Sequence, residues 1–98
     1  MAAYVIADVQ LHDPEAFKPY SERVPDVIAR HGGSYLVRGG EVEVKEGDWH
    51  PKRIVVLRFE DMDAARRWYE SPEYAELIAL RQQSSTTNLL IVDGYPGA

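Results

Sequence analysis

The chain has 98 residues, of which 45% are hydrophobic and 28% charged, and its formal net charge at pH 7 is -5. This is the composition of a single globular domain, and the acidic balance argues against nucleic acid, whose binding rests on clustered Lys and Arg. No apolar run approaches the roughly 20 residues that span a bilayer, and no signal peptide is recognisable. Because cysteine is also absent, we expect a cytoplasmic protein without membrane association, disulfides or thiolate metal sites.

The first part of the chain predicts a strand followed by a helix. Residues 4–11 alternate between two sets of side chains, as the two faces of a strand require. Asp13 and Pro14 then match an N-cap and a first-turn proline, and apolar residues recur at helical spacing beyond them. Pro19 and Pro25 fall inside this helix. Because each proline removes a backbone donor, we expect the helix to be bent or broken there.

Two glycine pairs flank the second predicted strand, which spans residues 34–38. The pair at 32–33 follows the helix, where a residue of positive φ commonly ends it. The pair at 39–40 marks a bulge or bend before an extension of the edge strand over 41–46, where valines alternate with acids. The glycines therefore serve first as backbone devices.

The second half of the chain predicts one strand, two helical segments and a last strand. After a turn, residues 53–59 are rich in strong strand formers and close a hairpin. Asp61 and Ser71 are suited to cap consecutive helices, the second reaching about residue 83. Residues 89–93 form the last strand, before an exposed tail.

The resulting order, βαββαβ, predicts one ferredoxin-like domain of the α+β class over residues 1–98. In this fold helices cover one face of a four-stranded antiparallel sheet with the spatial order 4-1-3-2. The face toward the helices should be the continuous apolar set, namely Val5, Ala7, Val9, Leu11, Val55, Leu57 and Phe59.

The opposite face of the predicted sheet mixes apolar and charged side chains. We expect it to carry Tyr4, Ile6, Asp8, Gln10, Leu36, Arg38, Ile54, Val56 and Arg58. Such an apolar patch usually marks an interface, and a second copy related by a twofold axis would cover it. A closed space between the two sheets, or between sheet and helices, would then hold Asp8, Arg38 and Arg58.

Several short motifs resemble one known family. They are DPEAF at 13–17, HGG at 31–33, LVRGG at 36–40, EGDW at 46–49 and A-x-x-WY-x-SPEY at 65–74. Together they resemble, almost end to end, the domain-of-unknown-function family 1330, which is similar to the dimeric α+β barrel superfamily. That superfamily includes cofactor-free monooxygenases acting on polycyclic aromatics, muconolactone isomerases and haem-binding chlorite dismutase-like proteins.

The resemblance implies a homodimer more than any chemistry, because one fold carries many functions. The family has no agreed catalytic residues. Its third strand tends to have Glu before Phe, whereas this chain has Arg58 before Phe59. A role that rests on that carboxylate is therefore not expected here.

Three residues are candidates for catalysis or proton transfer: His31, Arg38 and Asp8. Arg38 is suited to clamp a carboxylate or a developing enolate, and histidine is the residue type most often used for proton transfer, which makes His31 a candidate general base. Both also have structural interpretations. The arginines could pair with Asp8 or Asp93, with Asp8 meeting Arg58 across neighbouring strands, and His31 could complement the free carbonyls at a helix C-terminus.

The candidate ligand-binding residues are Tyr20, Gly39, Trp49, Arg58 and Trp68. The aromatic ones could line a pocket for a flat apolar ligand. Core packing is the alternative for Trp68, because its spacing is helical, whereas Trp49 in its turn would stack on a partner or cap a cleft. The histidines lack metal-ligand spacing, so we expect no metal and no cofactor.

These observations favour a homodimer that binds a small anionic or aromatic metabolite in a cleft beside the sheet. A cofactor-free enzyme is one form of this hypothesis. The alternative is a non-catalytic dimeric structural or interaction module, whose polar sheet residues form internal ion pairs.

Overall fold

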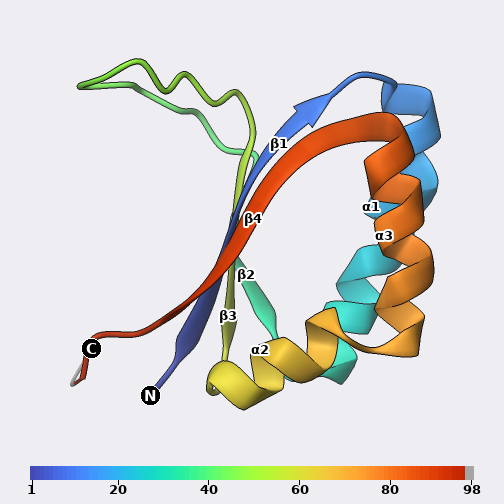
Figure 1. Cartoon of the computed structure of the whole chain (residues 1–98), viewed down its shortest axis with the longest axis vertical. Coiled ribbons are helices and arrows are strands. Elements are labelled where there is room, and N and C mark those ends of the chain that lie inside the picture. Colours follow the sequence, from blue (N-terminus) through green and yellow to red (C-terminus); the bar gives the residue numbers. More distant parts are fainter. Residues whose placement is uncertain (97–98) are drawn as a thin grey trace.

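The structure, a computed structural model, describes residues 1–96. Its elements are β1 (Ala3–Leu11), α1 (Pro14–Arg30), β2 (Ser34–Arg38), β3 (Ile54–Phe59), α2 (Met62–Tyr69), α3 (Pro72–Ser84) and β4 (Ser85–Asp93). The strands form one antiparallel sheet in the order β2-β3-β1-β4, and the helices lie on one side of it (Figure 1). The predicted α+β class, ferredoxin-like βαββαβ order and strand order are confirmed. The predicted exposed tail comprises residues 94–98, of which Tyr95 is 81% exposed and residues 97–98 lie outside the described part.

All three predicted helix caps are formed. The side chain of Asp13 accepts a hydrogen bond from the Ala16 backbone nitrogen at 3.2 Å, and Asp61 accepts one from Ala64 at 2.8 Å. The Ser71 hydroxyl accepts from the Tyr74 nitrogen at 3.2 Å. Each cap satisfies a backbone donor that the first helical turn leaves free, so local sequence alone fixes where these helices begin.

The helix α1 is continuous from Pro14 to Arg30 and includes both internal prolines. We expected the helix to be bent or broken at Pro19 and Pro25, and the structure shows that it is not broken at either residue. Four apolar side chains of this helix are buried against the rest of the protein, and such tertiary packing outweighs the loss of single backbone hydrogen bonds. Pro25 still leaves the Ser21 carbonyl without its usual helical donor.

A bulge in β2 changes which way Arg38 faces. Tyr35 pairs with Leu57 and Arg38 with Val55, and the register shifts between Tyr35 and Val37. One extra residue reverses the face on which the following side chains lie. Arg38 therefore lies on the helix side of the sheet. Our placement of Arg38 on the opposite face was wrong, because the bulge lies within the strand and not at the glycine pair after it.

Residues 39–53 form an irregular connection and not the predicted edge extension over 41–46. In Figure 1 this segment projects from the sheet on the side away from the helices. Pro51 has no backbone donor, and β3 begins only at Ile54, so the alternating valines have no strand to pair with. In contrast, β4 begins earlier than predicted, directly after α3, because Ser85 to Asn88 already pair with β1.

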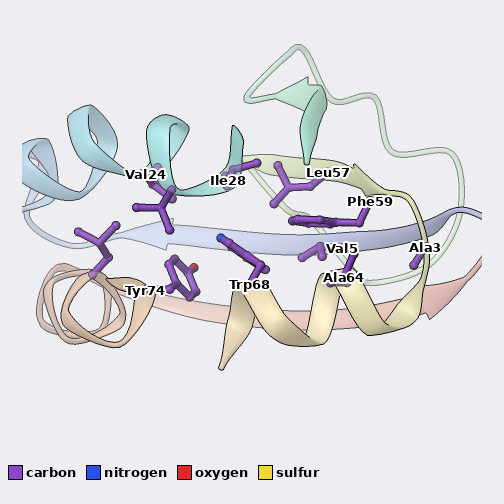
Figure 2. Close-up of a cluster of buried hydrophobic side chains, with 12 residues drawn as sticks. Ala3, Val5, Val24, Ile28, Leu57, Phe59, Ala64, Trp68 and Tyr74 are labelled. Atoms are coloured by element: carbon purple, nitrogen blue, oxygen red, sulfur yellow. The ribbon is translucent and has the colours of Figure 1, made fainter. Parts of the chain in front are cut away.

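The core lies between the sheet and the helices, as Figure 2 shows. The predicted inward strand residues Val5, Ala7, Val9, Leu57 and Phe59 are buried, and Val55 is half-buried. The exception is Leu11, which is 36% exposed at the end of β1. Within residues 1–96, no helix has both the length and the apolar character needed to cross a membrane.

The contact between the end of α1 and the sheet depends on Gly33. A Cβ atom at this position would lie 2.6 Å from a ring carbon of Phe59 and 2.7 Å from Cγ2 of Ile28, both in the buried core. We expect Gly33→Ala to lower the free energy of unfolding by about 1–3 kcal/mol, the usual cost of overpacking.

Gly40→Ala is the matched control, because a Cβ there meets no atom within 4 Å and its φ is not positive. We expect that variant to stay within about 0.5 kcal/mol of the wild type. Urea titration measures both values, and equal stabilities of the two variants would contradict this close packing.

Candidate functional site

A cavity of about 40 Å³ lies between the sheet and the helices. Most of its wall is apolar, and its polar lining consists of arginines, tyrosines and two hydroxyl residues, without any Asp or Glu. The polar lining residues are Tyr20, Ser21, Tyr35, Arg38, Arg53, Tyr74, Arg81 and Thr87. The cavity is therefore both apolar and positively charged.

Arg81 brings a buried positive charge to this cavity from α3. Its side chain is 5% exposed, and its Nη1 donates to the Tyr74 hydroxyl at 3.4 Å. Its Nε is enclosed and has no acceptor among the described residues. Burying a charge without a counter-charge costs several kcal/mol, so Arg81 lowers the free energy of unfolding.

Arg53 directly precedes β3 and approaches the cavity beside Phe17. Its guanidinium carbon is 5.8 Å from the Phe17 ring centroid, and its Nε is also enclosed without an acceptor among residues 1–96. Gly39 makes this position possible. Its φ is +70°, and a Cβ atom there would lie 2.8 Å from Nη1 of Arg53.

Arg38 lies at the mouth of the cavity, because it lines the cavity and is exposed to solvent as well. Its Nη2 donates to the Ser21 carbonyl at 2.9 Å and to the Ser21 hydroxyl at 3.3 Å, and its guanidinium carbon is 4.7 Å from the Tyr35 ring centroid. This is the carbonyl that receives no helical hydrogen bond, because Pro25 has no backbone N–H. The bulge and the proline together thus position Arg38 across the mouth.

Two tyrosine hydroxyls meet inside the cavity wall. The hydroxyls of Tyr20 on α1 and Tyr74 on α3 are 2.7 Å apart. Burial raises the pKa of Tyr20, and burial together with the neighbouring Tyr20 raises the pKa of Tyr74 further. Both phenols are therefore protonated at neutral pH. When Tyr74 donates to Tyr20, the Tyr20 hydroxyl keeps its own proton for a group in the cavity.

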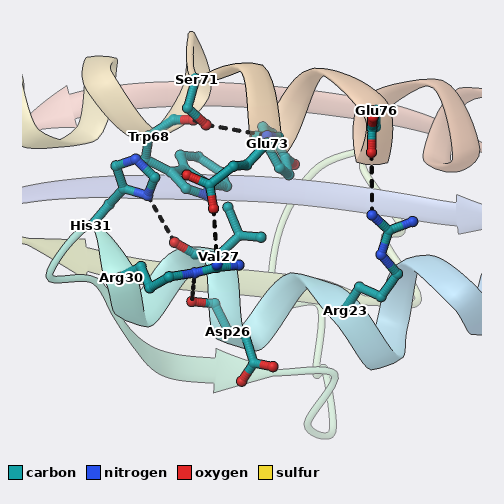
Figure 3. A network of polar contacts seen from close by, with 10 residues as sticks. Arg23, Asp26, Val27, Arg30, His31, Trp68, Ser71, Glu73 and Glu76 are labelled. Carbon is teal, nitrogen blue, oxygen red and sulfur yellow. Dashed lines mark hydrogen bonds and ion pairs between the residues drawn. The ribbon is translucent and has the colours of Figure 1, made fainter.

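Some arginines outside the cavity have acidic partners, which the cavity arginines lack within residues 1–96. Arg23 lies 3.3 Å from Glu76 and Arg30 lies 3.1 Å from Glu73, so two ion pairs join α1 to α3 (Figure 3). Among the ion pairs of the described residues none includes Arg38, Arg53 or Arg81. Exposed pairs are worth at most about 1 kcal/mol each. Of the cavity arginines, Arg81 is buried, so its unpaired charge lies where charge is most costly.

The structure brings only some of the predicted site residues together. Arg38, Tyr20 and Trp68 line the cavity. Gly39 lies against the side chain of Arg53, which lines the cavity as well. The ring of Trp68 is also part of the core, 4.3 Å from that of Tyr74, and its Nε1 is buried without an acceptor within residues 1–96.

His31 lies apart from the cavity, at the C-terminus of α1. Its Nδ1 is 2.8 Å from the Val27 carbonyl (Figure 3). This contact agrees with the structural role considered for His31, in which the ring hydrogen-bonds to a free backbone carbonyl at the end of the helix. Within residues 1–96, no cluster of three or more His, Asp or Glu side chains is suited to hold a metal ion.

Asp8, Trp49 and Arg58 lie on the face of the sheet that the helices leave open. Trp49 is 61% exposed, and its Nε1 donates to the Asp8 carboxylate at 2.7 Å. Asp8 pairs in register with Ile54, whereas Arg58 pairs with Tyr4, four positions along the strand. The predicted contact between Asp8 and Arg58 was therefore wrong.

Sequence reasoning missed Arg53 and Arg81, although periodicity could have found both. Arg53 precedes Val55, Leu57 and Phe59 in steps of two, so the alternation of β3, continued by one residue, places it on the inward face. Arg81 follows Leu77 by four residues and Tyr74 by seven, which places it on the buried stripe of α3. The two residues were passed over because arginine usually occupies surface positions.

Solved structures share this fold at low sequence identity. A protein of unknown function from Rhodopseudomonas palustris has a TM-score of 0.70 and 18% identity, with 96% of this chain and 82% of that chain covered. SnoaB, a cofactor-independent oxygenase from Streptomyces nogalater, has a TM-score of 0.65 and 19% identity, with 96% and 92% covered. A Mycobacterium tuberculosis protein has a TM-score of 0.61 and 17% identity, with 100% and 99% covered.

These neighbours have the dimeric α+β barrel fold of the antibiotic biosynthesis monooxygenase type. No curated protein matches the chain. The family model for DUF1330, a domain of unknown function, matches residues 2–95. Since that match covers nearly the whole chain, the protein belongs to the DUF1330 family.

Proposed function

We propose that the protein binds a small organic anion in the cavity between the sheet and the helices. One observation carries this proposal: the cavity has three arginines and no carboxylate in its lining. Arg81 in particular is buried without an ion pair among the described residues. A bound anion would supply the missing counter-charge, and the guanidinium fork suits a carboxylate.

In this proposal Arg53 and Arg81 hold the anion, Arg38 adds positive charge at the mouth of the cavity, and Tyr20 donates a hydrogen bond to the anion. Trp68 contributes an apolar wall and Gly39 leaves room for Arg53. The other candidates from the sequence, His31, Asp8, Trp49 and Arg58, are assigned no contact with this ligand.

The alternative of a non-catalytic module expects the polar sheet residues to neutralise one another. The free charge of the cavity arginines favours ligand binding over that alternative. SnoaB is a cofactor-independent oxygenase, and a cofactor-free enzyme is one form that an anion-binding protein of this fold could take. A cytoplasmic location is part of the proposal and rests on the sequence.

We also propose that the protein is a homodimer that buries the open face of the sheet. This face presents apolar side chains to solvent in the single chain, among them Leu90 at 54% and Val92 at 43% exposure. Ile6 and Val56 lie beside them in the sheet. A twofold-related copy would cover the same surface on both chains.

The anion proposal is tested with Arg81→Met, which removes the buried charge and keeps most of the volume. Without added anion we expect the variant to be as stable as the wild type or more stable by about 1–4 kcal/mol, because an unfavourable charge disappears. Small organic acids at ten times their Kd should stabilise the wild type by about 1.4 kcal/mol. That corresponds to a Tm increase of about 6–11 °C, which the variant should lack.

Arg67→Met is the matched control, because Arg67 is exposed on α2 and does not line the cavity. It should respond to the acids as the wild type does. Thermal unfolding at constant ionic strength measures these shifts. A wild type that responds to no acid, together with a destabilised Arg81→Met, would show that Arg81 is structural.

The dimer is tested with Leu90→Lys, which places a charge on the open face. We expect light scattering to give twice the 11.1 kDa chain mass for the wild type and the single-chain mass for the variant. Gln82→Lys, at an exposed position on α3, should leave the dimer intact. A wild type of single-chain mass at micromolar concentration would refute the dimer.

A further inference from the structure

The volume of the cavity limits the size of its ligand. The cavity measures about 40 Å³. An engineered protein cavity that binds benzene has about 150 Å³. The space thus fits a group of a few non-hydrogen atoms and is too small for an aromatic ring. Of the two ligand types considered from the sequence, anionic and aromatic, the volume favours the first.

The lining favours a carboxylate over an inorganic anion. The guanidinium groups of Arg53 and Arg81 suit a planar two-oxygen group, and the Tyr20 hydroxyl can donate to it. Around them the wall is apolar, with Ala7, Val55 and Leu89 among its residues. A short alkyl tail would lie well against these side chains. A phosphate would press polar oxygens against them, which costs free energy.

Arg38 lies at the mouth of the cavity. Of the residues that line the cavity within residues 1–96, it is the one that is exposed. Its hydrogen bonds to Ser21 join β2 to α1 across this opening. The tail of a longer acid must therefore pass the position that the Arg38 side chain occupies.

We infer that the cavity takes a short-chain monocarboxylate, of about two or three carbons by volume, and that Arg38 limits the length of its tail. The carboxylate lies between Arg53 and Arg81, and the tail lies against the apolar wall. This inference rests on the proposed anion binding and adds to it the class of ligand and the residue that determines specificity.

The test compares acetate, propionate, hexanoate, benzoate and inorganic phosphate by calorimetric titration at constant ionic strength. For the wild type we expect propionate to bind at least about tenfold more tightly than hexanoate or benzoate. Phosphate should show no measurable binding. Arg38→Ala should reduce the preference for propionate over hexanoate by about tenfold, because the mouth is widened. The ratio of the two affinities is the readout, since it cancels any general loss of positive charge.

Arg67→Ala is the matched control, and it should keep the wild-type ratio. A wild type that binds hexanoate or benzoate as tightly as propionate would overturn the length limit and leave anion binding in place. Phosphate binding as tight as that of propionate would overturn the carboxylate assignment. If none of the acids binds the wild type, the proposed function itself fails. An unchanged ratio in Arg38→Ala would remove Arg38 from the specificity assignment.

Discussion

The packing of all three helices on the sheet depends on the aromatic cluster around Trp68. Its ring lies 5.3 Å from that of Phe59 on β3 and 4.3 Å from that of Tyr74 on α3. Tyr74 in turn bonds to Tyr20 on α1. Through this chain of contacts one side chain of α2 joins the sheet to both long helices. These rings hold the helices at a fixed position relative to the sheet. The core is therefore closely packed around Trp68, and a cavity remains beside this cluster.

The fold followed from local signals and the candidate site did not. Caps at Asp13, Asp61 and Ser71 and the alternation along β1 and β3 are short-range features, so the sequence predicted the element order and the inward face of the sheet. The site depends on where strands pair. The bulge after Tyr35 determines the face of the sheet on which Arg38 lies, and no local sequence pattern predicts this bulge.

The remaining errors have a common cause, which is that tertiary contacts outweigh local preferences. α1 stays continuous through Pro19 and Pro25 because its apolar face is buried. The valines at 42 and 44 form no strand, because nothing lies beside them to pair with. Arg53 and Arg81 follow the inward periodicity, yet their charge suggests the surface. In each case the deciding partner is distant in the sequence.

The bulge in β2 has a consequence for how members of this family are compared. It allows Tyr35 and Arg38, an odd number of positions apart, to line the same cavity from one strand. A relative with the same number of residues but regular pairing through this strand would keep the strand order and the hydrophobic core, yet its guanidinium group would face outward. An alignment without gaps would then place both arginines in one column, although only one of them lies at this opening. Sequence identity at the arginine itself would not reveal the difference.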